Sequence, residues 1–154
     1  MKKRLMSVIA VVLTMLVVSG CGGKSVEVNS QELADALKAG ITYKDDISVI
    51  DLETAKMFYS FSDAAITESV FYEGSGGTAE EIVVIKCESE ADAAKIEEAF
   101  RQRMSEQKEA FTDYVPGELE KINAAVIYKK GNMAVLSVSD EPDKARSIID
   151  SYFK

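Results

Sequence analysis

The pattern of apolar and polar residues changes abruptly near residue 20. Residues 5–18 are apolar apart from Ser7 and Thr14, and three basic residues at positions 2–4 precede them. This run is shorter than the roughly 20 residues that a membrane-spanning helix needs. A basic segment followed by a short apolar run is typical of a secretory signal, so we expect residues 1–20 to be a signal peptide.

The most regular pattern lies between about residues 90 and 114, where core positions recur every three or four residues. The series, with one glutamine in it, consists of Ala93, Ile96, Phe100, Met104, Gln107, Phe111 and Tyr114. This spacing predicts one long amphipathic helix, which Pro116-Gly117 ends. A helix of about 25 residues is roughly 37 Å long, whereas a strand usually spans about 17–20 Å. We therefore expect its C-terminal end to extend beyond the sheet and to be covered by the N-terminal helices.

Shorter patterns predict four strands and three short helices. The strands are expected at residues 66–72, 82–87, 125–128 and 134–138. The short helices are expected at residues 31–39, from about 51 and from about 142, with Ser30 and Asp140 as N-caps of the first and last. Residues 82–85 form an unbroken apolar run, typical of a strand covered on much of both faces. Residues 45–51 are interpreted as a polar connection.

The two hairpin-and-helix segments resemble each other. Residues 85–87 align with residues 136–138, and apolar positions in the helices that follow align after one inserted residue. We therefore expect an α+β fold of two layers, in which two β-β-α units form a four-stranded antiparallel sheet with helices on one face. Residues 30–154 are expected to form a single domain. Gene duplication and shared packing rules explain the likeness equally well.

Charge and composition exclude several kinds of function. The chain carries a formal charge of −8, and without residues 1–20, which hold three basic residues and no acidic one, the charge is −11. Such a domain repels phosphate backbones, so no nucleic acid is expected as a partner. The chain has no histidine, which removes histidine-dependent triads and almost all catalytic zinc sites. We expect no cofactor, no metal site and no enzymatic activity.

Residues 18–21, Val-Ser-Gly-Cys, add a specific motif at the end of the signal segment. They resemble the lipobox of bacterial lipoproteins, in which a branched aliphatic residue and two small residues precede a cysteine. Small side chains allow the extended backbone to enter the protease, and the cysteine sulfur accepts a diacylglycerol. We expect cleavage after Gly20, lipidation of Cys21 and a flexible tether over residues 21–29.

A lipidated Cys21 predicts where the protein acts. Two acyl chains give a stable anchor, whereas one chain holds only marginally. The expected location is the extracytoplasmic face of the cell membrane, with membrane lipid as the partner through diacylglyceryl-Cys21. The alternatives are an uncleaved signal anchor and a signal peptide followed by a chance cysteine.

The other reactive or charged groups fit structural roles better than catalysis. Lipidation of Cys21 leaves Cys87 without a disulfide partner, so we expect a free buried thiol there. The glycines of residues 74–77 precede acidic residues and a strand rather than a helix, which favours a hairpin loop over a phosphate cradle. The acidic pairs, such as Glu80-Glu81, are interpreted as solvated surface or helix caps.

One polar residue departs from the core pattern of the long helix. Gln107 occupies a core position, and Arg103 lies one turn before it. A polar side chain in such a place must be hydrogen-bonded or half exposed. Gln107 therefore either pins the loop after Tyr114 to the helix or contacts a ligand. Arg103, Gln107 and Tyr114 are the candidate binding residues.

Three groups of residues resemble motifs of a known family. Residues 79–82, Ala-Glu-Glu-Ile, are similar to an A-D/E-E-I strand motif. The motif R-x-x-x-Q-x-x-x-F-x-x-Y-x-P is matched by Arg103, Gln107, Phe111, Tyr114 and Pro116. Gly131-Asn132 before a strand and Ser139-Asp140 after it complete the set.

Together these motifs resemble a family of small lipoproteins from Gram-positive bacteria that is described only as a domain of unknown function. The resemblance runs from about residue 45 to the end. It implies an extracytoplasmic, lipid-anchored domain and assigns no activity. We expect a module that binds an envelope protein or a small ligand. The alternatives are a histidine-free hydrolase with two carboxylates in one cleft and a structural envelope spacer without a pocket.

Overall fold

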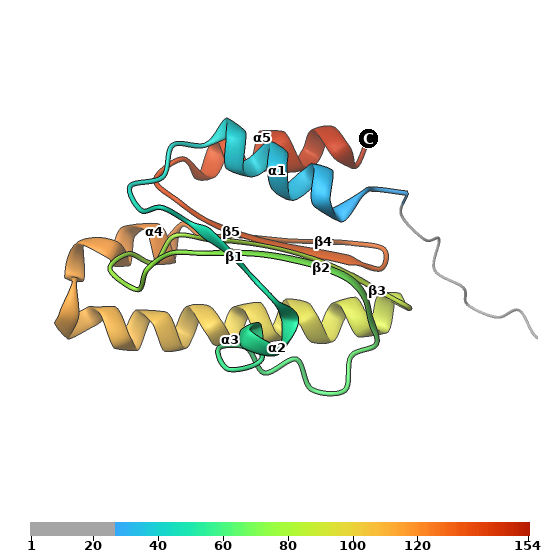
Figure 1. Ribbon diagram of the computed structural model, residues 1–154, viewed down its shortest axis with the longest axis horizontal. Helices are drawn as coiled ribbons and strands as arrows, with labels where there is room; N and C mark the ends of the chain where they lie inside the picture. The colour runs from blue at the N-terminus through green and yellow to red at the C-terminus, as the bar shows by residue number, and fades with distance from the viewer. Residues whose placement is uncertain (1–26) are drawn as a thin grey trace, which may run out of the picture.

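The computed structural model describes residues 27–154, which are coloured in Figure 1. Five antiparallel strands form one sheet in the order β1-β2-β3-β5-β4. The strands are β1 (Ser48–Ile50), β2 (Ile66–Glu73), β3 (Glu81–Cys87), β4 (Val126–Lys130) and β5 (Met133–Val138). The predicted signal peptide, the cleavage at Gly20 and the lipidated Cys21 lie outside the described residues.

The prediction of four strands was wrong, because β1 adds a fifth strand at the edge of the sheet. Its three residues pair antiparallel with residues 71–73 of β2. The sequence showed only a polar connection here, since β1 is too short to display an alternating pattern and Val49 is 66% exposed. Pairing with β2, rather than the local sequence, makes this segment a strand.

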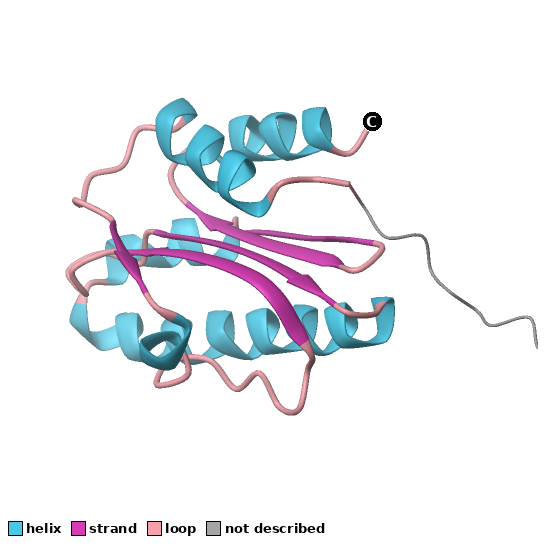
Figure 2. Ribbon diagram, turned by 45° about the vertical axis from the view of Figure 1, so that its right-hand side comes forward, coloured by secondary structure: helices cyan, strands magenta, loops and turns pink. Residues whose placement is uncertain are grey.

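The sheet is covered by helices on both faces, so the two-layer prediction with helices on one face was also wrong. Helices α1 (Ser30–Gly40) and α5 (Pro142–Tyr152) lie on one face, as Figures 1 and 2 show. The long helix α3 (Glu90–Tyr114) and the short helix α2 (Leu52–Ala55) lie on the other.

The burial of the central strand β3 explains why the fold has three layers, with helices on each face of the sheet. Val83 and Ile85 of β3 pack in a hydrophobic cluster with α3, whereas Ile82 and Val84 pack in a second cluster with α1 and α5. All four side chains are fully buried. A strand buried on both faces needs a hydrophobic layer on each side, and the unbroken apolar run of residues 82–85 is the sequence sign of it.

The two β-β-α segments are present, but their helices are not equivalent. A twofold axis normal to the sheet would relate the antiparallel neighbours β3 and β5 and keep both following helices on one face. In the structure α3 and α5 lie on opposite faces (Figure 1). The aligned apolar positions therefore reflect similar packing rules and not a symmetric pair of units.

Helix α3 has the bounds that its periodicity predicted. The Ser89 side chain caps it by accepting a hydrogen bond from the Asp92 N–H, and the helix ends just before Pro116. The expectation that the N-terminal helices cover its C-terminal end was wrong for α1, which lies on the other face. A short 3₁₀ helix, η1 (Pro116–Glu118), and α4 (Leu119–Asn123) pack there instead. Neither of these two elements was predicted.

Two residues before α1 attach the start of the described region to the rest of the domain. Val28 is buried in the cluster beneath α1 and α5. The side chain of Asn29, rather than the predicted Ser30, caps α1 by accepting from the Glu32 N–H, 3.0 Å away. Ser30 instead donates its hydroxyl to Glu68 on β2 at 2.8 Å. Helix α5 has Glu141, not Asp140, at its N-cap, without a side-chain cap.

Candidate functional site

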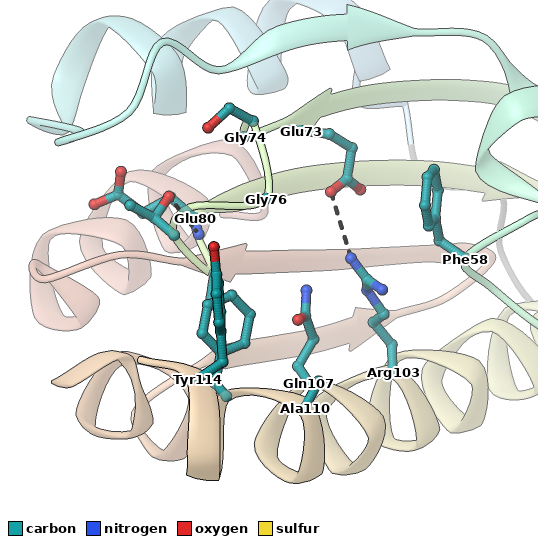
Figure 3. Close-up of a pocket in the computed structure, with 13 residues that line it drawn as sticks. Phe58, Glu73, Gly74, Gly76, Glu80, Arg103, Gln107, Ala110 and Tyr114 are labelled. Carbon is teal, nitrogen blue, oxygen red and sulfur yellow. Dashed lines mark hydrogen bonds and ion pairs between the residues drawn. The ribbon is translucent and has the colours of Figure 1, made fainter. Parts of the chain in front are cut away.

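A pocket of about 370 Å³ lies between the C-terminal half of α3 and the loop that joins β2 to β3. Figure 3 shows Arg103, Gln107 and Tyr114 along one side of it and the glycine loop on the other. Phe58, which follows α2, stands at one end, and Tyr114 stands at the opposite end. The pocket thus forms where α3 extends past the strands, beside the end of the β2–β3 hairpin.

The three residues singled out in the sequence all line this pocket. Gln107 is half-buried and points from α3 toward the sheet, next to Arg103 (Figure 3). No described residue forms a hydrogen bond with its side chain, so Gln107 does not pin the loop after Tyr114. Tyr114 is 71% exposed. The site therefore contains an amide group that has no structural partner and an aromatic ring that is open to solvent.

Arg103 has a structural role as well as a place in the pocket wall. Its Nη2 lies 3.3 Å from Glu81 Oε2 and 3.7 Å from Glu73 Oε2. Its guanidinium lies over the rings of Phe58 and Tyr59, 5.5 and 5.3 Å from their centroids. The guanidinium thus holds two carboxyl groups on one side and packs against the aromatic end of the pocket.

Glu73 and Glu81 lie directly opposite each other on β2 and β3. The hydroxyl of Tyr59 lies 2.9 Å from Glu81 Oε2 and 3.1 Å from Glu73 Oε1. We call Tyr59, Glu73, Glu81 and Arg103 the pocket cluster. Within it Glu73 lines the cavity, whereas Glu81 lies behind it.

The pocket cluster holds one cation for two acids, and this imbalance shifts the protonation of Glu73. Burial, followed by the negative charge of Glu81 and a hydrogen bond between the two carboxyl groups, raises the pKa of Glu73 to about 9. Glu73 is therefore protonated at neutral pH. The other oxygen of Glu81, Oε1, is buried, and no N–H or hydroxyl group of the described residues donates a hydrogen bond to it. A proton on Glu73 allows the hydrogen bond between the two carboxyl groups.

Glu80 belongs to a different arrangement, which we call the clasp cluster and define as Glu80, Glu118 and Lys121. The Lys121 ammonium lies 2.8 Å from Glu80 Oε1 and 3.0 Å from Glu118 Oε2. Glu80 Oε2 accepts from the backbone N–H groups of Lys44 and Asp45, both at 2.8 Å. The clasp cluster joins α4 to β3 and to the segment before β1. The interpretation of Glu80-Glu81 as solvated surface was therefore wrong, because both side chains are buried.

The loop that forms the upper wall of the pocket is ordered by one carboxylate. Asp45 Oδ2 accepts from the N–H and the hydroxyl of Ser75, both at 2.8 Å, and from the Thr78 hydroxyl at 3.1 Å. Gly76 adopts a φ of 90°, which favours glycine. The loop is followed by a strand and faces the cavity, so it is a hairpin loop, as predicted.

Cys87 has the environment that the sequence predicted. Its thiol is free and buried. Burial raises the pKa of Cys87 to about 11, so the group is a neutral thiol and a poor nucleophile at neutral pH. Within residues 27–154, no group of three or more acidic, cysteine or histidine side chains is placed to hold a metal ion. No helix in this range is long and apolar enough to cross a membrane.

Comparison with known families gives a match over most of the described residues. The family model described as a domain of unknown function (DUF4358) matches residues 40–139. The chain belongs to the DUF4358 family. This confirms the resemblance to a domain-of-unknown-function family. The DUF4358 segment includes all five strands and every residue that lines the pocket, whereas α5 and almost all of α1 lie outside it. The comparisons with curated proteins and with solved structures found no match.

Sequence reasoning missed Glu73, Tyr59 and Phe58 in this DUF4358 pocket. Glu73 carried a signal, because it ends the strand before the glycine loop and a hairpin register can place it opposite Glu81. Phe58 and Tyr59 carried none, since they reach the pocket through a turn after α2 whose path depends on the packing of the whole layer.

Proposed function

We propose that this DUF4358 protein is a lipid-anchored binding module on the outer face of the cell membrane, and that it takes a small ligand into the pocket beside α3. The observation that carries the proposal is the side chain of Gln107. It faces a cavity of about 370 Å³ and has no structural partner among the described residues. A half-buried amide in a cavity wall can bond solvent or a ligand, and we infer that a ligand is the partner of Gln107.

The position of the pocket relative to the start of the domain supports this role. Helix α1 begins at the end of the domain where α3 also begins, and the pocket lies at the opposite end, near the end of α3 (Figure 1). A chain anchored through Cys21 would therefore carry its pocket on the side that faces away from the attachment point, where a ligand outside the membrane can reach it.

The arrangement of the acids favours binding over hydrolysis. A two-carboxylate mechanism requires both carboxyl groups to face the substrate. Two acids, Glu73 and Glu80, line the cavity, but both oxygens of Glu80 are already bonded to Lys121 and to backbone N–H groups. Glu81 is fully buried behind Glu73 and paired with Arg103. A structural spacer would need no cavity, so the pocket also favours a ligand-binding role over that alternative.

The binding proposal is tested with Gln107→Ala and a matched control. The purified full chain in detergent micelles is incubated with a small-molecule extract of the source cells, and retained compounds are identified by mass spectrometry. We expect the unsubstituted protein to retain a defined compound and Gln107→Ala to retain at least tenfold less. Gln102→Ala removes an exposed glutamine of the same helix that bonds only Glu106, and it should behave like the unsubstituted protein. Equal retention by all three proteins would overturn the proposal.

The anchor is tested with Cys21→Ser. A serine hydroxyl cannot take the place of the thiol in lipid transfer, so the variant should leave the membrane fraction or accumulate with residues 1–20 attached. Cell fractionation and mass spectrometry of the N-terminus measure both outcomes. A variant that stays in the membrane with the same processed N-terminus would contradict lipidation at Cys21.

A further inference from the structure

We propose that the pocket selects cations, and that its ligand joins a protonated amine to an apolar or aromatic group. This inference rests on the proposed function, because it names the chemistry of the ligand for the same pocket. It follows from three features of the site: its charge balance, its aromatic ends and the position of Gln107.

The charge balance is set by the groups that face Glu73 from each element around it. Glu81 faces it from β3, Arg103 from α3, and the neutral hydroxyl of Tyr59 from the segment after α2. With both acids ionised, this pocket cluster carries one negative charge in excess. The neighbouring clasp cluster supplies no cation to this balance, because Glu80 and Glu118 already share Lys121.

The loop on the other side of the cavity adds no cation. Its charged contact is Asp45, whose carboxylate is bound to Ser75 and Thr78. An anionic ligand would therefore meet the carboxyl groups of Glu73 and Glu80 in the cavity wall with Arg103 already engaged, in a domain of strongly negative net charge. A ligand with one positive charge near Glu73 completes the balance instead.

The ends of the pocket suit the apolar part of such a ligand. Phe58 is 42% exposed and Tyr114 is 71% exposed, which leaves both rings free to contact a ligand from opposite ends. Aromatic faces attract ammonium groups as well as apolar surface. The amide oxygen of Gln107 lies between them as an acceptor for an N–H group. A cavity of about 370 Å³ is in the range of small-ligand sites.

The empty pocket balances its charge with a proton, and this couples ligand binding to pH. Burial and the charge of Glu81 keep Glu73 protonated until the pH approaches about 9. An ammonium group beside Glu73 favours the ionised carboxylate, so binding releases the proton. The affinity for a cation should then rise as the pH rises toward that value, by about tenfold per pH unit for one released proton.

The test compares three probes of similar size and different charge: 2-phenylethylamine, 2-phenylethanol and phenylacetate. Each is titrated into the full chain in detergent micelles, and the NMR signals of the Gln107 side-chain amide and the Gly76 N–H report occupancy of the pocket. We expect the amine to bind at least tenfold more tightly than the alcohol and phenylacetate not to bind. The affinity for the amine should increase about tenfold per unit between pH 6 and pH 8.

Two variants show whether Glu73 causes these effects. Glu73→Gln removes the titrating carboxyl group, so the preference for the amine over the alcohol and the dependence on pH should both disappear. Glu68→Gln is the control, because Glu68 lies on the same strand but outside the pocket and pairs with Lys86. It should leave both effects unchanged.

The outcomes separate this inference from the proposed function. Equal affinity for the amine and the alcohol would overturn cation selectivity and leave a binding pocket in place. Preference for phenylacetate would also overturn it and would identify Arg103 as the group that selects the ligand. If no probe shifts either signal, the inference is wrong for aromatic amines, while compound retention by the Gln107 and Gln102 variants judges the proposed function independently.

Discussion

Glu80 lies just before β3 and Glu81 is the first residue of that strand, and their carboxylates belong to two different buried clusters. In the clasp cluster, Glu80 receives two backbone N–H groups and the Lys121 ammonium, so both of its oxygens are satisfied. In the pocket cluster, Glu81 shares Arg103 with Glu73, and its Oε1 receives no hydrogen bond from the usual donors of the described chain. The two clusters meet at adjacent residues and each holds two acids and one cation, but they differ in how completely their carboxylate oxygens are hydrogen-bonded.

This difference distinguishes a structural charge from a candidate functional one. A buried acid with a full set of partners holds elements together, and nothing remains for a ligand to satisfy. Both clusters hold two acids and one cation, but the pocket cluster adjoins a cavity and leaves a buried carboxylate oxygen without a hydrogen bond, so a cationic ligand can supply what the fold does not. Perturbed protonation in a cleft is a recognised sign of a functional site, and here it coincides with an unpartnered amide at Gln107.

The largest effect is expected from breaking the clasp cluster at Lys121, whose side chain is only 2% exposed. Lys121→Met leaves Glu80 and Glu118 buried without a cation, which should lower the free energy of unfolding by about 3–5 kcal/mol. Urea denaturation followed by circular dichroism measures this. Lys44→Met, which removes an exposed ion pair with Asp140, should cost less than about 1 kcal/mol. Equal losses would show that Lys121 is not the centre of the clasp.

The next largest effect on stability should distinguish Glu80 from Glu81. In Glu80→Gln, an amide NH₂ replaces the oxygen that faces Lys121, so two donors meet and the free energy of unfolding should fall by about 2 kcal/mol. In Glu81→Gln, the NH₂ can take the position of the unpartnered Oε1 and donate to Glu73, while Arg103 pairs with an ionised Glu73. That variant should lose less than about 1 kcal/mol. The reverse order in denaturation experiments would contradict the contrast between the clusters.

The smallest effect concerns the pH dependence of stability. The pKa of Glu73 is raised to about 9 in the folded state, above the ordinary glutamate value of 4.5, so between these values the folded chain holds a proton that the unfolded chain has lost. Its contribution is present at low pH and is lost as the pH rises between these values. Glu73→Gln should therefore match the unsubstituted protein near pH 4.5 and be more stable than it at pH 8, with a difference that grows steadily between these two values. Thermal denaturation across pH measures the difference.

Glu68→Gln is the control for this comparison, because the fold lowers the pKa of Glu68 whereas it raises the pKa of Glu73. A hydrogen bond from Ser30 lowers the pKa of Glu68, so its contribution is present at neutral pH and is lost as the medium becomes acidic. The substitution should cause a small loss of stability at pH 7. A gain in stability at pH 8 for both variants would show that the protonation of Glu73 is not responsible.

Much of the fold followed from local patterns, and the exceptions have physical causes. Helix α3 and the two hairpins were predicted because their apolar periodicity is long or flanked by clear turn residues. The edge strand β1 and the pair η1 and α4 were missed because each is only three to five residues long. Such elements form where neighbouring elements give them partners, which no local pattern records.

The candidate site was predictable to a similar extent. Arg103, Gln107 and Tyr114 share one helix, so their periodicity and a polar residue in a core position were enough to single them out. Glu73 and Tyr59 come from other parts of the chain and meet Arg103 only in the folded molecule. The balance of charges in the pocket could not be counted before these contacts were known.

The sequence alone determined the extent of the long helix, the two hairpins, the buried cysteine and the acidic character of the domain, because these depend on periodicity and composition. Tertiary structure decided that helices cover both faces of the sheet, since that choice depends on which elements bury β3 and β5 together. It also decided that both oxygens of Glu80 are hydrogen-bonded, whereas Glu81 shares one arginine with Glu73 and keeps one oxygen without a hydrogen bond. Glu80 and Glu81 are adjacent and identical, yet burial surrounds their carboxylates with different charged groups, and burial depends on the whole fold.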